Sequence, residues 1–164
     1  MTALSDSPAL DLDGEPRSDS PARAGVDPRG PQFGAALTSV ILAAVLLTPV
    51  PVAIGLLALQ TVLFALGVAR GVGRTPYAWL FRTYVRPRLA PPADLEDPRP
   101  PRFAQAVGLT FAGLALIAYA AGAVVVGQVL VGFALAAAFL NAAFAFCLGC
   151  EMYLAAARLR VARL

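Results

Sequence analysis

The sequence predicts an all-α integral membrane protein with four transmembrane helices, and three observations support this fold class. Two stretches of the 164-residue chain, 30–69 and 103–150, contain no Lys, Arg, Asp, Glu or His. Hydrophobic residues make up 59% of the chain and charged residues 14%, against about 45–50% and 25% in a typical soluble domain. The 13 basic residues are all arginine, and they gather outside the two uncharged stretches. A soluble fold of this size cannot hide so much continuous apolar chain.

The N-terminal segment, 1–25, is rich in Ser, Pro and Asp and shows no apolar periodicity. A segment of this composition cannot bury enough surface to offset its ordering entropy, so we expect a disordered tail. Because it is polar and Pro-rich, we expect no cleavable signal peptide in it. Arginine without lysine, together with abundant Ala, Gly and Pro, is typical of a bacterial genome of high GC content.

The first uncharged stretch predicts a hairpin of two spans, at about 33–48 and 52–69. The sequence Thr48-Pro49-Val50-Pro51 interrupts it near its middle. Because a spanning helix needs about 20 residues, the length of the stretch fits two spans joined at the prolines.

The loop between the two stretches, 70–102, holds seven arginines against three carboxylates. Thr75 can cap a helix that has Pro76 in its first position, which predicts a helix over 75–86. Its aromatic residues alternate with arginine, as expected of an amphipathic helix in the anionic inner leaflet of the membrane; they are Tyr77, Trp79, Phe81 and Tyr84. We expect no nucleic-acid binding, because the segment is tethered between two spans.

The second uncharged stretch predicts spans at about 103–120 and 123–146, with Gly122 at their turn, followed by a short basic tail, 155–164. The central loop and this tail carry ten of the 13 arginines. By the positive-inside rule both are cytoplasmic, and four spans then place the N-terminus on the same side. The predicted location is the bacterial inner (plasma) membrane, with both termini in the cytoplasm.

The chain repeats a short motif before each uncharged stretch. Residues 97–103 match residues 27–33 at an offset of 70, with five of seven positions identical. Each copy precedes a two-span hairpin, so we expect two tandem repeats within a membrane domain over 26–154. An even number of spans in each repeat makes the two halves parallel rather than inverted.

Both cysteines lie where the last apolar stretch meets charge. Cys147 and Cys150 are three residues apart, so on a helix they share a face with Glu151. The Cys-x-x-Cys spacing is typical of redox dithiols and of half a zinc or iron–sulfur site. A metal site would need ligands from a second chain, because there is no His and no third Cys, so we expect no metal and no cofactor. The alternative is that both cysteines are small apolar packing residues.

We expect this cluster to close the fourth span at its cytoplasmic end. There the negative end of the helix dipole and Glu151 both disfavour a thiolate. The pair is therefore expected to be a dithiol that another protein oxidises or reduces, rather than the attacking thiol. Asn141 lies about 120° around a continuous helix from Cys147. We expect it to bond between helices and not to join the cysteines.

Several motifs, in this order, resemble the bacterial integral-membrane family known as domain of unknown function 4395. They are Asp27–Pro31, Leu95–Arg99, Phe103–Gln105, Asn141–Phe144 and Cys147–Glu151. The resemblance implies a four-helix membrane protein, associated with sulfurtransferase and thioredoxin-like proteins. It implies no established activity.

Two functions remain open on the sequence. In the first, Cys147 and Cys150 form the dithiol of a thiol-redox or sulfur-handling membrane protein. Glu151 then tunes the pair or delivers a proton, and a cytosolic thioredoxin-like protein or sulfurtransferase is the partner. In the second, the chain is a non-enzymatic scaffold or a component of a small-solute permease. Few polar residues lie in the spans, which weighs against a permease. Neither reading makes the chain an enzyme on its own, and both are compatible with a homo-oligomer.

Overall fold

The computed structural model describes residues 25–92 and 94–161, and in these ranges the regular structure is entirely helical. The predicted disordered tail, apart from Gly25, and the last three residues of the basic tail lie outside the described residues. The six α-helices are α1 Arg29–Leu47, α2 Val50–Arg70, α3 Pro76–Leu80, α4 Arg99–Ala120, α5 Val124–Phe144 and α6 Leu148–Val161.

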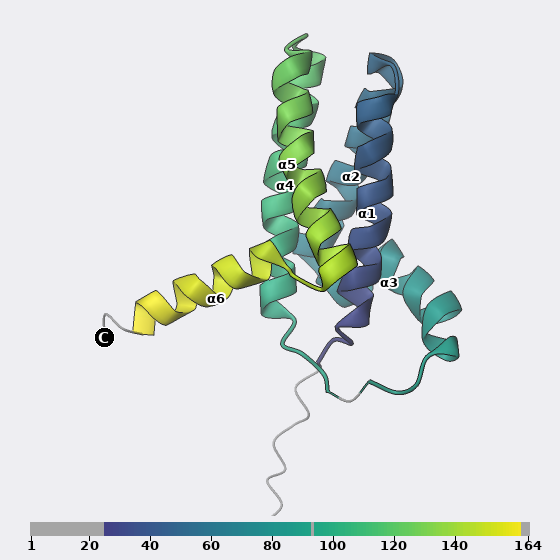
Figure 1. Cartoon of the computed structure of the whole chain (residues 1–164), viewed down its shortest axis with the longest axis vertical. Coiled ribbons are helices and arrows are strands. Elements are labelled where there is room, and N and C mark those ends of the chain that lie inside the picture. Colours follow the sequence, from purple (N-terminus) through teal and green to yellow (C-terminus); the bar gives the residue numbers. More distant parts are fainter. Residues whose placement is uncertain (1–24, 93, 162–164) are drawn as a thin grey trace, which may run out of the picture.

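Four of these helices, α1, α2, α4 and α5, are long and apolar enough to cross a membrane. They contain 19 to 22 residues, which corresponds to about 28–33 Å at the α-helical rise and matches a hydrocarbon core of about 30 Å. The predicted all-α fold with four apolar helices is therefore confirmed. Figure 1 shows them aligned as one bundle, with α3 and α6 leaving its lower end on opposite sides.

The two hairpin turns lie at the same end of the bundle, which we call the turn end (Figure 1). Pro49 precedes α2 in an extended conformation (φ −59°, ψ 151°), so the prolines break the first apolar stretch as the sequence predicts. In the second hairpin Gly122 has a φ of 81°, which a residue without Cβ adopts freely. The opposite end, at Arg29, Arg70 and Arg99, is called the arginine-rich end.

The bundle packs through small and branched residues near its axis. α1 contacts α2 and α5, and α4 contacts the same two helices. A cluster of buried residues joins all four spans; its members are Leu42, Val45, Ala53, Leu57, Ala115, Tyr119, Val131 and Ala134. Many large apolar side chains instead face outward, including Leu47, Ile117 and Val125. An apolar exterior around an apolar core is the pattern expected of helices whose solvent is lipid.

A chain of three polar side chains links α1, α2 and α3. Gln60 is fully buried; its Nε2 donates to Thr38 Oγ1 at 3.3 Å, and its Oε1 accepts from the Tyr77 hydroxyl at 2.9 Å. Burial of the Tyr77 ring raises the pKa of its hydroxyl, so it stays a hydrogen-bond donor at neutral pH. Tyr77 therefore fastens the start of α3 to the bundle.

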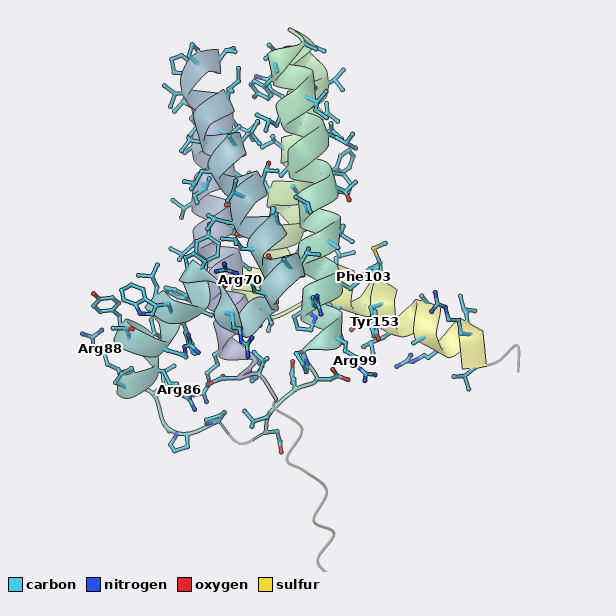
Figure 2. All side chains as sticks on the ribbon, turned by 180° about the vertical axis from the view of Figure 1, so that it is seen from behind. Arg70, Arg86, Arg88, Arg99, Phe103 and Tyr153 are labelled. Atoms are coloured by element: carbon cyan, nitrogen blue, oxygen red, sulfur yellow. A yellow bond between two sulfur atoms is a disulfide. The ribbon has the colours of Figure 1, made fainter. Side chains whose placement is uncertain are left out.

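The segment after α2 is helical from Pro76 to Arg88, which overlaps the helix predicted over 75–86, and its amphipathic character stays a prediction. Thr75 Oγ1 accepts the Ala78 N–H at 3.2 Å, which confirms the predicted cap. A π-helical turn, Phe81–Val85, and a 3-10 turn, Arg86–Arg88, continue α3 away from the bundle. Figure 2 shows Arg86 and Arg88 near its far end. Its position in a membrane interface stays a prediction.

The two halves of the chain make matching contacts at the arginine-rich end. Val26 and Glu96, which occupy equivalent positions just before the two copies of the motif, exchange two backbone hydrogen bonds of 3.0 Å in an antiparallel bridge. One position further on, the carboxylates of Asp27 and Asp97 each accept the backbone N–H of the arginine two positions later, at 3.0 and 2.9 Å. A bridge between equivalent residues has a local twofold axis between them.

A second matched pair of contacts joins each half to the other. Gln32 Nε2 donates to the Ala142 carbonyl at 3.1 Å, and Arg102 Nε donates to the Val68 carbonyl at 2.7 Å. Both carbonyls belong to the last turn of a span, where the helix itself supplies no partner. Each half thus caps the second span of the other. The tandem repeat stays a prediction, and these paired contacts support it.

Candidate functional site

The fourth span ends earlier than the sequence predicts, and this moves the cysteines to a different helix. α5 stops at Phe144 because Ala145 is left-handed, with a φ of 54°. The Ala145 N–H donates to the Asn141 carbonyl and the Phe146 N–H to the Leu140 carbonyl, at 3.1 and 3.4 Å. The bond from Ala145 to Asn141 is the single bond of an αL helix ending, which usually has glycine at the left-handed position. The expectation that the cysteines close the fourth span is therefore wrong.

The cysteine pair instead opens α6. Cys147 and Cys150 form a disulfide, with their Cα atoms 5.2 Å apart. Cys147 directly precedes the helix, and its carbonyl accepts the Glu151 N–H at 3.0 Å. Its sulfur also accepts the Cys150 N–H at 3.3 Å. The three predicted site residues, Cys147, Cys150 and Glu151, thus lie together in the first turn of α6.

This position reverses the helix-dipole part of the electrostatic argument made from the sequence, whereas the Glu151 carboxylate stays close to the cysteines. A helix N-terminus presents unpaired N–H groups and the positive end of the helix dipole, which favour a thiolate. Once the disulfide is reduced, the N–H that now points at the Cys147 sulfur can stabilise its negative charge. Glu151 is exposed and also lies in the first turn, where an acidic side chain suits the dipole.

Close packing against α4 fixes the start of α6. A Cβ added to Gly149 would lie 2.7 Å from both Cα and Cβ of Ala104, so only glycine fits this crossing without a shift. One turn further, the rings of Phe103 and Tyr153 are 5.8 Å apart. Figure 2 shows these two rings together where α6 leaves the bundle.

The same construction occurs in the first half of the chain, at the start of α3. There Thr75 precedes the helix, its Oγ1 accepts the Ala78 N–H at 3.2 Å, and its carbonyl accepts the Trp79 N–H at 3.0 Å. Cys147 makes the corresponding bonds with the residues three and four positions later. The disulfide therefore occupies a helix-capping position whose counterpart holds a threonine.

A cavity of about 270 Å³ lies next to the disulfide. Residues of α1, α2, α4, α5 and α6 line it, and Cys147 is among them. Gln105 and Asn141 supply two amide groups to an otherwise mainly apolar wall. The break at Ala145 explains why Asn141 and Cys147 share this cavity, contrary to the expectation from a continuous helix. The sequence does not indicate that Gln105 lines a cavity or that a cavity forms here, because both depend on how the helices pack.

Among residues 25–92 and 94–161, no three side chains of His, Cys, Asp or Glu gather in one place. The cysteine sulfurs are bonded to each other, and a zinc site requires thiolates.

The fold and the site define a multi-pass helical membrane protein with a paired Cys-x-x-Cys at the start of a peripheral helix. The chain belongs to the family described as Domain of unknown function (DUF4395), which it matches over residues 26–158. This is the family that the sequence motifs resemble. No curated protein and no solved structure matches the chain.

Proposed function

We propose that this protein is a membrane thiol–disulfide exchanger whose Cys147–Cys150 pair reacts with a cytosolic thioredoxin-like protein or sulfurtransferase. The observation that carries the proposal is the disulfide at the N-terminus of α6. Cys147 occupies the capping position of α6 and Cys150 lies in its first turn, a placement that apolar packing alone does not require. A helix N-terminus is where proteins generate reactive thiolates.

The arginine distribution supports a cytoplasmic position for the pair. The arginine-rich end holds Arg29, Arg70 and Arg99 at the helix boundaries, and α6 starts at this same end (Figures 1 and 2). Positively charged loops stay in the cytoplasm during membrane insertion. Both termini and the disulfide then face the cytosol, where partner dithiols are kept reduced.

Exchange would proceed through Cys150. A thiolate of the partner attacks the Cys150 sulfur, the S–S bond breaks, and Cys147 leaves as the thiolate that the α6 N-terminus stabilises. The partner's second thiolate then attacks the partner's other sulfur, which is bonded to Cys150 in the mixed disulfide. Cys150 leaves as a thiolate. The partner dithiol becomes a disulfide, and Cys147 and Cys150 take up two protons. Glu151, exposed in the same turn, relays these protons to and from solvent.

Trapping of the mixed disulfide tests the proposal. Full-length Cys147→Ser and Cys150→Ser proteins in inverted membrane vesicles are mixed with a thioredoxin that lacks its resolving cysteine, under mild oxidation. Because Cys147 is the leaving thiol, Cys147→Ser should accumulate about five times more adduct than the matched Cys150→Ser variant. If neither variant forms adduct and both leave cell growth under thiol stress unchanged, the thiol exchange is refuted and the non-enzymatic scaffold is supported.

A further inference from the structure

We propose that the cavity beside Cys147 binds the ring of a lipid-soluble quinone, which accepts two electrons from the Cys147–Cys150 dithiol. This inference rests on the proposed thiol exchange and names the membrane electron acceptor for it. The wall of the cavity includes Cys147, whereas Cys150 lies outside that wall. One cysteine can therefore face a ligand in the bundle while the other faces a partner protein.

The size of the cavity suits an aromatic ring. Its volume is about 270 Å³, and an engineered apolar cavity of about 150 Å³ already binds benzene. The space therefore accommodates a substituted benzene or a naphthalene ring. Three phenylalanines, Phe64, Phe111 and Phe133, stand in its wall and offer stacking partners.

The polar groups of the cavity suit a neutral ligand with carbonyl oxygens. Gln105 and Asn141 both line it. Each side-chain amide carries N–H groups that can donate to the carbonyl oxygens of a ligand in the cavity. No charged side chain of the described residues lines the cavity. A phosphate-bearing nicotinamide or flavin cofactor would be left without a counter-charge there, whereas a quinone needs only donors for its two oxygens.

The cavity also reaches the outer surface of the bundle. Phe133, on the membrane-spanning helix α5, lines the cavity and is 63% exposed. Met152, on α6, lines it and is 53% exposed. Both side chains are apolar, so the entrance offers a path from the lipid for a hydrophobic molecule. Water-soluble oxidants have no such preference for this route.

The redox step balances with the quinone as oxidant. The Cys147 thiolate adds to a ring carbon, forming a C–S bond, and one thiol proton goes to a quinone oxygen. The Cys150 thiolate then attacks the Cys147 sulfur, the S–S bond forms, and the C–S bond breaks with its electron pair remaining on the ring. The second thiol proton goes to the other oxygen. Dithiol and quinone have become disulfide and quinol.

Quinone titration of the reduced full-length protein in lipid nanodiscs tests the inference. The probes are a short-chain benzoquinone and a short-chain naphthoquinone, followed by their absorbance and by alkylation of both cysteines. We expect one quinol per disulfide formed and a rate that saturates with quinone concentration. Ala138→Phe, which fills the cavity, should lower the oxidation rate at least about ten-fold. Ala143→Phe, on the same helix but outside the cavity wall, should leave the rate unchanged.

Two further results keep the test decisive. Asn141→Leu, which preserves size and removes the amide, should raise the half-saturating quinone concentration by about ten-fold. The inference is overturned if the oxidation rate rises linearly with quinone concentration and is equal in the parent and Ala138→Phe proteins. It is also overturned if a phospholipid chain stays in the cavity at saturating quinone. If quinones do not oxidise the dithiol while reduced thioredoxin still reduces the disulfide, the quinone site is refuted and the proposed thiol exchange is supported. If neither reagent reacts, both the quinone site and the thiol exchange are refuted.

Discussion

Replacing Gly149 with alanine tests the contact that holds α6, and with it the disulfide, against α4. The new Cβ would lie 2.7 Å from Cα and Cβ of Ala104, while ordinary van der Waals contacts begin at 3.4 Å. The two helices must therefore separate by about 0.7 Å or distort locally. Because one of the two atoms is a backbone Cα, a change of side-chain rotamer cannot relieve the overlap.

The expected loss of stability follows from this overlap. Overpacking of a tight contact costs about 1–3 kcal/mol. Gly149 lies in the first turn of α6, so the gain in helix propensity, at most about 1 kcal/mol, offsets only part of this. We expect a net loss of about 1–2 kcal/mol in the free energy of unfolding. Adding Ala104→Gly should restore part of it, because the Cβ overlap disappears and the Cα overlap remains.

Unfolding of the detergent-solubilised full chain by SDS, followed by circular dichroism, measures this loss. Gly113→Ala, on α4, is the matched control, because the Cβ it adds meets no atom within 4 Å beyond its chain neighbours and the backbone of its own helix. That control should be at least as stable as the parent. A Gly149→Ala protein no less stable than the control would show that α6 does not pack on Ala104, and the account of the site would be refuted.

The remaining predictions concern other parts of the fold. Tyr77→Phe should lower the free energy of unfolding by about 1–3 kcal/mol, because buried Gln60 loses a donor; an SDS titration equal to that of the parent would contradict the network. Ala145→Gly should raise stability by about 1 kcal/mol, since glycine adopts the left-handed conformation without strain, whereas an unchanged midpoint would mean that the strain at Ala145 is negligible. A peptide of residues 75–88 should bind anionic vesicles, with each arginine near the surface contributing about 1 kcal/mol, and salt-independent binding would assign the affinity to its aromatic residues alone.

Hydropathy and turn chemistry predict the bundle well, because both act locally along the chain. The uncharged stretches 30–69 and 103–150 leave room for four spans, and the prolines after Thr48 and the glycine at 122 end helices through their own backbone preferences. The cap at Thr75 was predictable for the same reason. These features can be predicted without knowing which helices pack against each other.

The site depends on contacts that local patterns do not encode. Alanine is a strong helix former, so nothing at Ala145 indicates a left-handed residue that ends α5. That single backbone change moves Cys147 from the end of one helix to the start of another and brings Asn141 into the same cavity. Gly149 is visible as a potential break, but its role depends on Ala104, which lies on a different helix and far away in the sequence.

The central claim is that Cys147 and Cys150 form a reversible redox pair on the cytoplasmic side. Alkylation by a membrane-impermeant maleimide, in inverted and right-side-out vesicles equilibrated in thiol–disulfide buffers of graded potential, tests it most directly. We predict labelling of both cysteines together, from the cytoplasmic face only, in one two-electron transition between about −120 and −270 mV, the range of dithiol oxidoreductases. Labelling from the outside, or a midpoint below about −300 mV as in structural disulfides, would contradict the account.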